Sequence, residues 1–173
     1  MKQNGDIDEE ENKIVEQILK GVNVLMNKSK SDIRMNNHHG QELKTLLDDE
    51  MNTLFKLTHH NVFRIQIQVF KLLLQFAKVT QKMGNEQLSK SEEPNQGPNF
   101  ADRFYRTLYE LLLKCHATSL DDYFGLIFRA VKSDESVARA TAFIKRLLQM
   151  TYLNECNFTA ATLLVISEIL KQR

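Results

Sequence analysis

The sequence predicts an all-α protein, and three observations support this. Apolar residues recur every three or four positions over long stretches, a spacing that winds an apolar stripe along one side of a helix. The 173 residues include only six glycines and two prolines, so few positions interrupt a helix. Hydrophobic residues make up 42% of the chain, enough for one continuous core. We expect an armadillo/HEAT-like stack of about seven antiparallel helices, with a closed helical bundle as the alternative.

Three of the expected helices lie in the N-terminal half. An acidic lead-in, residues 1–12, precedes the first of them and is expected to be disordered. Asn61 is the expected cap near the start of the third. The three apolar stripes consist of Ile14, Ile18, Leu19, Val22 and Leu25; of Leu43, Leu46, Leu47, Met51, Leu54 and Phe55; and of Ile65, Val69, Phe70, Leu72, Leu73, Phe76 and Ala77.

Two further helices are expected in the middle of the chain. The first is ADRFYRTLYELLL, residues 101–113, with Asn99 as its N-cap and an Asp102 carboxylate that stabilises the positive end of the helix dipole. The second is LDDYFGLIFRAVK, residues 120–132, with Ser119 as its cap. The joins are only a few residues long, so consecutive helices are expected to run antiparallel.

The last two helices are expected over residues 137–150 and 158–171. Ser133 or Asp134 is the expected cap of the first, VARATAFIKRLLQM. The second contains ATLLVISEIL, which is apolar nearly all round, so it is expected to lie buried between neighbours. The side chains expected at the buried centres of the apolar stripes are Phe124, Ile127, Leu147, Leu148 and Leu164.

Two segments are expected to be irregular. Residues 83–99 hold both prolines, two glycines and mostly polar side chains, so they bury too little to offset the entropy of ordering. Residues 27–41 form a second expected loop. The expected organisation is a single helical domain over residues 13–173 with a flexible loop at about residues 83–99.

Four segments together resemble a known family. DRFYRTLYELL, a helix with a Phe-rich face, KSDESVARATAFIKRLLQ and ATLLVISEIL are similar to the domain shared by the CCAAT-binding-factor family of nucleolar complex (Noc) proteins. The branch of CCAAT/enhancer-binding protein zeta is the most similar, and LKGVN and MNTLFKLTH fall in the family's order. The resemblance covers residues 14–170. Family members are much longer than this chain, which implies one block of a larger protein or a shortened relative.

Basic side chains gather on two successive helices. The first twelve residues hold five acidic groups and one lysine, which leaves 22 basic and 17 acidic groups in the rest of the chain. A solvated helix face is the simpler interpretation, and contact with rRNA phosphates is the sharper one. No motif for sequence-specific base readout accompanies these residues. The candidate RNA or partner contacts are Arg129, Lys132, Arg139, Lys145 and Arg146.

Nothing in the sequence indicates a catalytic, cofactor or metal site. Glycine-rich phosphate loops and the spacings of hydrolase or zinc-protease motifs do not occur. The adjacent pairs His38/His39 and His59/His60 are poorly spaced to bind one ion together, and solvation is expected for both. Cys115 and Cys156 are expected to be free thiols near the core. We expect no enzyme activity, no small-molecule substrate, no cofactor and no membrane segment.

Three functions remain open. The resemblance implies a nucleolar scaffold in large (60S) ribosomal subunit assembly and pre-rRNA processing or export, located in the nucleus and nucleolus. Its implied partners are another Noc-family protein and pre-60S particles, with weak pre-rRNA contact that is indifferent to sequence. The second possibility is a CCAAT-box transcription regulator, which the lack of a DNA-reading motif disfavours. The third is a general helical-repeat adaptor that binds peptides.

Overall fold

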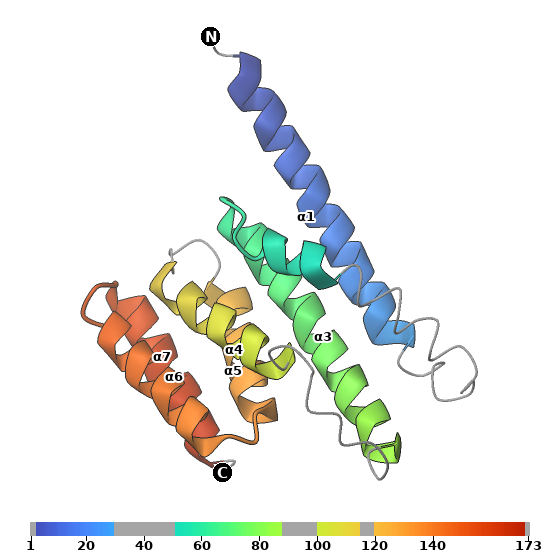
Figure 1. Cartoon of the computed structure of the whole chain (residues 1–173). Coiled ribbons are helices and arrows are strands. Elements are labelled where there is room, and N and C mark those ends of the chain that lie inside the picture. The colour runs from blue at the N-terminus through green and yellow to red at the C-terminus, as the bar shows by residue number, and fades with distance from the viewer. Residues whose placement is uncertain (1–2, 30–50, 88–99, 115–119, 172–173) are drawn as a thin grey trace. The chain divides into compact units, whose positions relative to one another are not determined.

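All regular structure in this protein is helical over the described part of the chain. The computed structural model describes residues 3–29, 51–87, 100–114 and 120–171, and each regular element in these ranges is a helix (Figure 1). The predicted all-α class is confirmed. The chain divides into two compact units, Met1–Ala101 and Asp102–Arg173.

Two long helices form most of the first unit. Helix α1 (Gln3–Ser29) packs along α3 (Phe63–Gln87), and residues 51–57 add a further helical segment (Figure 1). Asn23 of α1 joins the pair: its Nδ2 donates to the backbone oxygen of Gln68 at 3.1 Å, and its Oδ1 accepts from Gln75 Nε2 at 3.1 Å. The side chains of α3 that are at most 1% exposed are Ile65, Ile67, Val69, Phe70 and Leu73.

Helix α1 differs from its prediction in two ways. It begins at Gln3, so most of the lead-in expected to be disordered is helical. Ion pairs one turn apart, such as Glu9 to Lys13 at 2.8 Å, and the acidic groups near the N-terminus favour this helix. Of the five apolar residues expected in its core stripe, Leu19 alone is buried. The helix meets α3 through the side that holds Leu19 and Asn23, which leaves the rest of the stripe exposed.

The first residues of both expected loops are helical. Residues 83–87 belong to the end of α3, and residues 27–29 belong to the end of α1. Most residues at the end of α3 are good helix formers, which extends the helix past Gly84. The remaining parts of both predicted loops, residues 30–41 and 88–99, lie outside the described residues, as do Leu43, Leu46 and Leu47.

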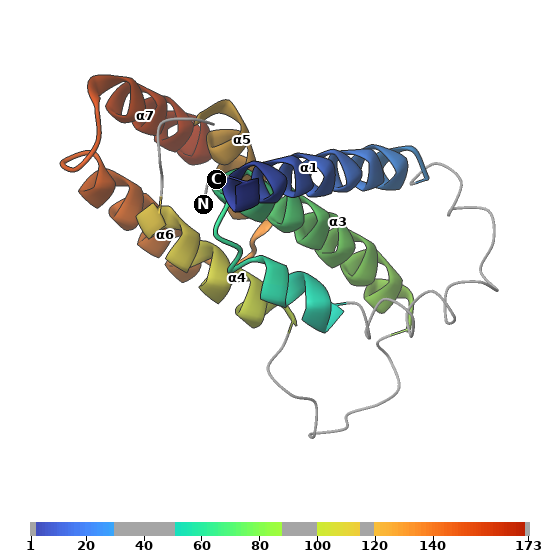
Figure 2. The same ribbon diagram turned by 90° about the horizontal axis from the view of Figure 1, so that it is seen from above.

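Four helices and a short 3-10 turn form the second unit. They are α4 (Phe100–Leu111), η2 (Leu112–Lys114), α5 (Leu120–Ser133), α6 (Val137–Met150) and α7 (Cys156–Lys171). Helices α4 and α6 lie side by side in one layer, and α5 and α7 lie side by side in the other (Figures 1 and 2). Helices that alternate between two layers in this way are consistent with the expected stack of helix pairs.

The burial predictions for this unit are partly right. Phe124, Ile127 and Leu147 are buried as expected, but Leu148 is 42% exposed and Leu164 is 69% exposed, so those two predictions are wrong. Leu148 follows the fully buried Leu147, and consecutive residues point about 100° apart on a helix, so only one of them faces the core. Leu164 lies on the side of α7 away from its neighbours α5 and α6.

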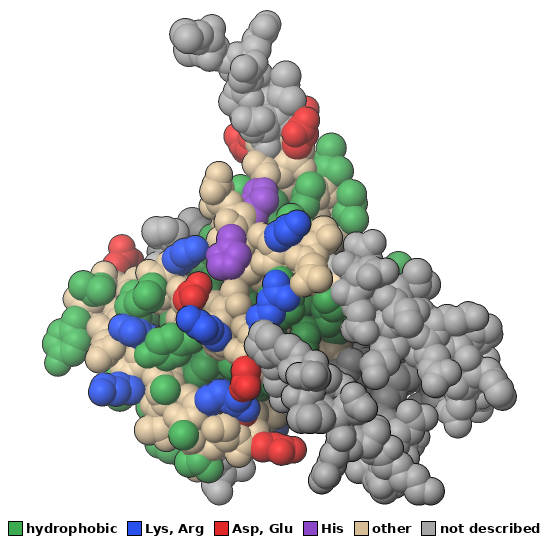
Figure 3. Space-filling view, viewed as in Figure 1, with side chains coloured by type: hydrophobic (Ala, Val, Ile, Leu, Met, Phe, Trp, Pro, Cys, Tyr) green, Lys and Arg blue, Asp and Glu red, His purple; other side chains and the backbone are tan. Residues whose placement is uncertain are grey.

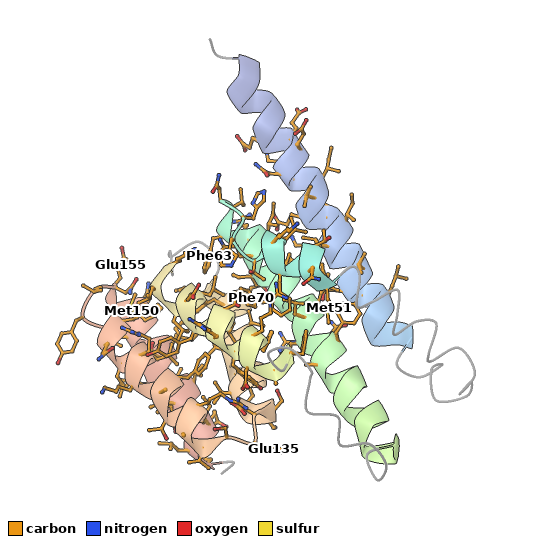
Figure 4. All side chains as sticks on the ribbon, in the orientation of Figure 1. Met51, Phe63, Phe70, Glu135, Met150 and Glu155 are labelled. Atoms are coloured by element: carbon orange, nitrogen blue, oxygen red, sulfur yellow. The ribbon has the colours of Figure 1, made fainter. Side chains whose placement is uncertain are left out.

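The ends of α6 and α7 also differ from prediction. Ser136, in place of Ser133 or Asp134, caps α6: its Oγ accepts from the backbone NH of Arg139 at 3.3 Å. Asp134 instead accepts from the backbone NH of Ser136 at 2.9 Å. Figure 4 labels Glu135 in this α5–α6 loop, and Met150 and Glu155 at the turn between α6 and α7. Cys156 is a free thiol but is exposed, where a site near the core was expected; Cys115 lies outside the described residues.

Candidate interaction surfaces

Tyrosines of α4 meet arginines of α6 along the second unit. We call this cluster the α4–α6 seam. Tyr105 and Tyr109 are four residues apart and therefore lie on one side of α4, and Phe143 of α6 packs edge-on against both rings, at centroid distances of 6.3 Å and 5.5 Å. The members of the seam are Asp102, Tyr105, Tyr109, Asp134, Arg139, Phe143 and Arg146.

Arg139 is the most heavily bonded cation of the seam. Its Nε and Nη2 donate to the two carboxylate oxygens of Asp134, both at 2.9 Å, and its Nη1 donates to Asp102 at 2.6 Å. The guanidinium also stacks over the Tyr105 ring, with Cζ 4.8 Å from the centroid. The hydrogen bonds with Asp134 raise the pKa of Arg139 above its usual value, so the group remains charged. Two carboxylates already neutralise it, which leaves little attraction for a phosphate.

Arg146 and Tyr105 complete the seam. Arg146 Nε donates to the Tyr109 hydroxyl at 3.1 Å, and its Cζ lies 5.1 Å from the centre of the same ring. The Tyr105 hydroxyl donates to the backbone oxygen of Ala130 at 3.0 Å, which ties α4 to α5 as well. These contacts hold three helices together. The seam therefore stabilises the unit, and two of the five candidate contact residues serve that purpose.

The three other candidate cations are exposed. Arg129 Nε donates to the backbone oxygen of Gly125, one turn earlier in α5, at 2.8 Å. Lys132 lies over the Phe128 ring, with Nζ 5.7 Å from the centroid. Lys145 of α6 is exposed as well. Within the described residues, no carboxylate pairs with any of these three groups, so their charges stay available to a ligand.

The structure does not bring the five candidates into one patch. Arg129 and Lys132 lie near the C-terminal end of α5, next to the loop that leads into α6. Lys145 lies two turns into α6, about 12 Å along the helix from its first residue. Lys and Arg side chains are interleaved with hydrophobic and acidic ones on the face seen in Figure 3. Cations spaced in this way can make a few separate phosphate contacts, but they do not line a continuous basic groove.

The outer side of α7 exposes apolar side chains. We call this surface the α7 outer face and define it by Ala160, Leu163, Leu164 and Leu170. The three leucines are 55%, 69% and 64% exposed. Tyr152 and Leu153, in the turn before α7, are 92% and 78% exposed. The sequence predicted a fully buried helix here, because an apolar composition does not say how many neighbours a helix has.

The described ranges contain no cluster of side chains suited to hold a metal ion. His60 Nδ1 accepts from the backbone NH of Val62 at 3.0 Å, which stabilises the turn before α3, and His59 is exposed. No group of three or more His, Cys, Asp and Glu side chains in the described chain is placed to hold a metal ion. None of the described helices is long and apolar enough to cross a membrane. His38 and His39 lie outside the described residues.

The described helices thus present exposed apolar and cationic side chains on a packed helical stack. Residues 66–173 match the model of the CBF/Mak21 family, and the chain belongs to this family. The resemblance inferred from the sequence is therefore confirmed. The matched range includes every helix of the second unit.

Several curated relatives are similar to the chain. Ribosome biogenesis protein NOC1 of Chaetomium thermophilum is 38% identical over 128 residues, which cover 72% of this chain and 11% of the relative. Nucleolar complex protein 1 of Drosophila melanogaster is 34% identical over 134 residues, 74% of this chain and 10% of the relative. CCAAT/enhancer-binding protein zeta of Mus musculus is 30% identical over 128 residues, 72% and 11% respectively. The chain thus spans about a tenth of these relatives, and no solved structure matches it.

The two most specific segments of the family resemblance turn out to form the seam. DRFYRTLYELL supplies Asp102, Tyr105 and Tyr109, and the helix that contains AFIKRLLQ supplies Phe143 and Arg146. From the sequence, the arginines were expected on a solvated helix face and the tyrosines had no expected partner. The sequence did contain a usable signal. Two tyrosines lie four residues apart on one helix and two arginines lie seven residues apart on another, so each pair lies along one side of its helix.

Proposed function

We propose that this chain is the helical-repeat segment of a nucleolar scaffold in the assembly of the large (60S) ribosomal subunit. Membership of the CBF/Mak21 family over residues 66–173 is the observation that supports this most, because relatives at 38% and 34% identity are named for ribosome biogenesis and for a nucleolar complex. The protein acts by binding, without chemistry of its own, and it serves pre-rRNA processing or the export of the particle.

In this proposal the α7 outer face binds another Noc-family protein. Leu163, Leu164 and Leu170 are exposed on a helix that the rest of the unit holds in place. Apolar side chains clustered on a rigid helix are the kind of surface that protein partners cover. Polar residues of the same helix, such as Glu168 and Lys171, which form an ion pair at 2.7 Å, would lie at the rim of this interface.

Contacts with pre-rRNA come from Arg129, Lys132 and Lys145. Isolated cations attract phosphates without reading bases, so this binding is weak, indifferent to sequence and lowered by salt. Arg139 and Arg146 contribute little, because their side chains are bonded within the seam. We expect Arg129→Glu with Lys132→Glu to lower RNA binding and the salt dependence together while leaving the fold intact. Arg139→Glu, the matched reversal in the seam, should unfold the unit instead.

The role is tested in cells with the protein that carries this chain. We expect it to co-sediment with pre-60S particles, and its depletion to stall the processing of large-subunit rRNA. Leu163→Asp with Leu164→Asp should remove a Noc-family partner from the affinity-purified complex, whereas Leu113→Asp, at another exposed leucine, should not. Exclusively cytoplasmic staining with normal rRNA processing after depletion would overturn the proposal. Promoter proteins in the purified complex would favour the transcription regulator, and unrelated peptides would favour the adaptor.

A further inference from the structure

Helix α1 docks on α3 by the more polar of two neighbouring sides. Leu19 and Asn23, on the docked side, are each 7% exposed. The side one residue earlier in each turn is apolar and exposed: Ile14, Ile18 and Val22 are 59%, 59% and 38% exposed. Burial of apolar area alone would favour the opposite arrangement. A specific contact therefore has to select the docked side.

Asn23 makes such a contact through both ends of its amide. Its Nδ2 donates to the backbone oxygen of Gln68 at 3.1 Å and to the Oε1 of the same residue at 3.4 Å. Its Oδ1 accepts from Gln75 Nε2 at 3.1 Å. Gln68 and Gln75 are seven residues apart and therefore lie on one side of α3. We call Asn23, Gln68 and Gln75 the amide clamp.

Rotation of α1 by one residue would break the amide clamp. A turn of about 100° about the helix axis would put Val22 in the place of Asn23. The Val22 side chain cannot form hydrogen bonds, and Gln68 is only 4% exposed, so water would not replace the lost partner. Buried polar groups without partners are costly, and a single buried asparagine is known to fix the register of paired helices.

We infer that the amide clamp selects the side of α1 that docks on α3 and thereby keeps the more apolar side exposed. The hydrogen bonds between the two helices are satisfied in one rotation of α1, whereas a leucine and an isoleucine bury similar areas. The other polar pair on the docked side, Glu16 with Lys20 at 2.7 Å, belongs to α1 alone. That pair would turn with the helix, so it does not contribute to the selection.

Thiol labelling reports which side of α1 is docked. Ile18→Cys and Leu19→Cys are made one at a time in the full chain, whose own two cysteines are replaced by Cys115→Ser and Cys156→Ser. Position 18 should react several-fold faster than position 19, because the side chains there are 59% and 7% exposed. The ratio of the two labelling rates thus measures the orientation of α1.

Exchange of two neighbouring residues tests the selection from the α1 side. Val22→Asn together with Asn23→Val moves the amide by one position and leaves the composition of the chain and all of α3 unchanged. The side that holds position 22 should then dock, so position 19 should label faster than position 18. An unchanged ratio would overturn the inference. Fast labelling at both positions would also overturn it, because α1 would then have left α3 without choosing a side.

Substitution on α3 tests the other half of the amide clamp. Methionine is unbranched like glutamine and lacks its amide, so Gln68→Met with Gln75→Met should let the apolar side of α1 dock and should also reverse the ratio. Gln66→Met is the matched control. Gln66 is equally buried, at 4% exposed, but it lies about 200° round α3 from Gln68 and donates to the backbone oxygen of His60. Equal helical circular dichroism shows that the variants are folded. An unchanged ratio in the double variant, or a reversal in the control, would overturn the inference.

Discussion

The α4–α6 seam and the α7 outer face differ in an unexpected way: charged side chains are packed in the seam, whereas apolar side chains are exposed on the outer face. In the seam, the arginines and an aspartate lie within packed contacts, and the side chain of Asp134 is only 2% exposed. On the α7 outer face, leucines are more than half exposed. Both surfaces lie on amphipathic or apolar helices of one unit.

The difference arises from what each helix side meets. Arg139 meets the Tyr105 ring and the carboxylates of Asp102 and Asp134, which neutralise its charge, and Arg146 meets the ring and hydroxyl of Tyr109; the rings cover the stems of both arginines. Leu163 and Leu164 meet no neighbouring helix in the described unit. A substitution in the seam should therefore change stability, and one on the outer face should change binding. The predictions below test that distinction, beginning with the largest effect.

Tyr105→Ala should have the largest effect on stability. The side chain is 8% exposed, packs against Phe143, lies under Arg139 and donates to Ala130 of α5. We expect a loss of about 3–5 kcal/mol in the free energy of unfolding, measured by urea denaturation. Tyr105→Phe keeps the ring and loses the hydrogen bond, so it should cost about 1 kcal/mol. A loss below 1 kcal/mol for the alanine variant would show that the seam does not hold the unit together.

Leu147 and Leu148 provide a comparison within one helix. Leu147 is fully buried, so Leu147→Ala should cost about 2–5 kcal/mol, while Leu148→Ala, at a side chain that is 42% exposed, should cost less than about 1.5 kcal/mol. Thermal and urea unfolding of the two variants under the same conditions give the comparison. Equal losses would mean that α6 is rotated relative to the structure described above.

Asp134→Asn should have an intermediate effect. It weakens both hydrogen bonds to Arg139 and leaves Asp102, whose side chain is 65% exposed, as the carboxylate that pairs with that cation. We expect a loss of about 1–3 kcal/mol. Asp102→Asn is the control and should cost less than about 1 kcal/mol, because an exposed ion pair is screened by solvent and salt. If the two variants are equally unstable, the burial of Asp134 has no energetic role.

The sequence was sufficient to predict the helices but not what covers them. Periodic apolar positions gave the helical class and three of the five buried positions, Phe124, Ile127 and Leu147. An apolar stripe in the sequence identifies one side of a helix, but the number of other helices that pack against that helix is set by the tertiary structure. Four of the five stripe residues of α1, all but Leu19, and Leu164 of α7 were therefore assigned to the core and lie exposed.

The candidate contact residues show the same limit for charged groups. Spacing along α6 placed Arg139 and Arg146 on one side, which the structure agrees with. What that side meets depends on the register between α4 and α6, which local spacing does not specify. Both guanidinium groups were expected on a solvated face. Asp102 and Asp134 neutralise that of Arg139, and that of Arg146 stacks on a tyrosine ring.

Leu164→Ser should have the smallest effect on stability of the four. The side chain is 69% exposed, so replacing it removes little buried apolar area, and the free energy of unfolding should stay within about 0.5 kcal/mol of the original. The same variant should weaken binding of the partner covering the α7 outer face, because that side chain would be buried on association. Leu113→Ser, at a leucine that is 53% exposed, should match it in stability and leave the partner bound. Urea unfolding and co-purification of the two variants separate the effects. A large loss of stability for Leu164→Ser would show that the leucine is covered within the chain, and the α7 outer face would then belong to the fold.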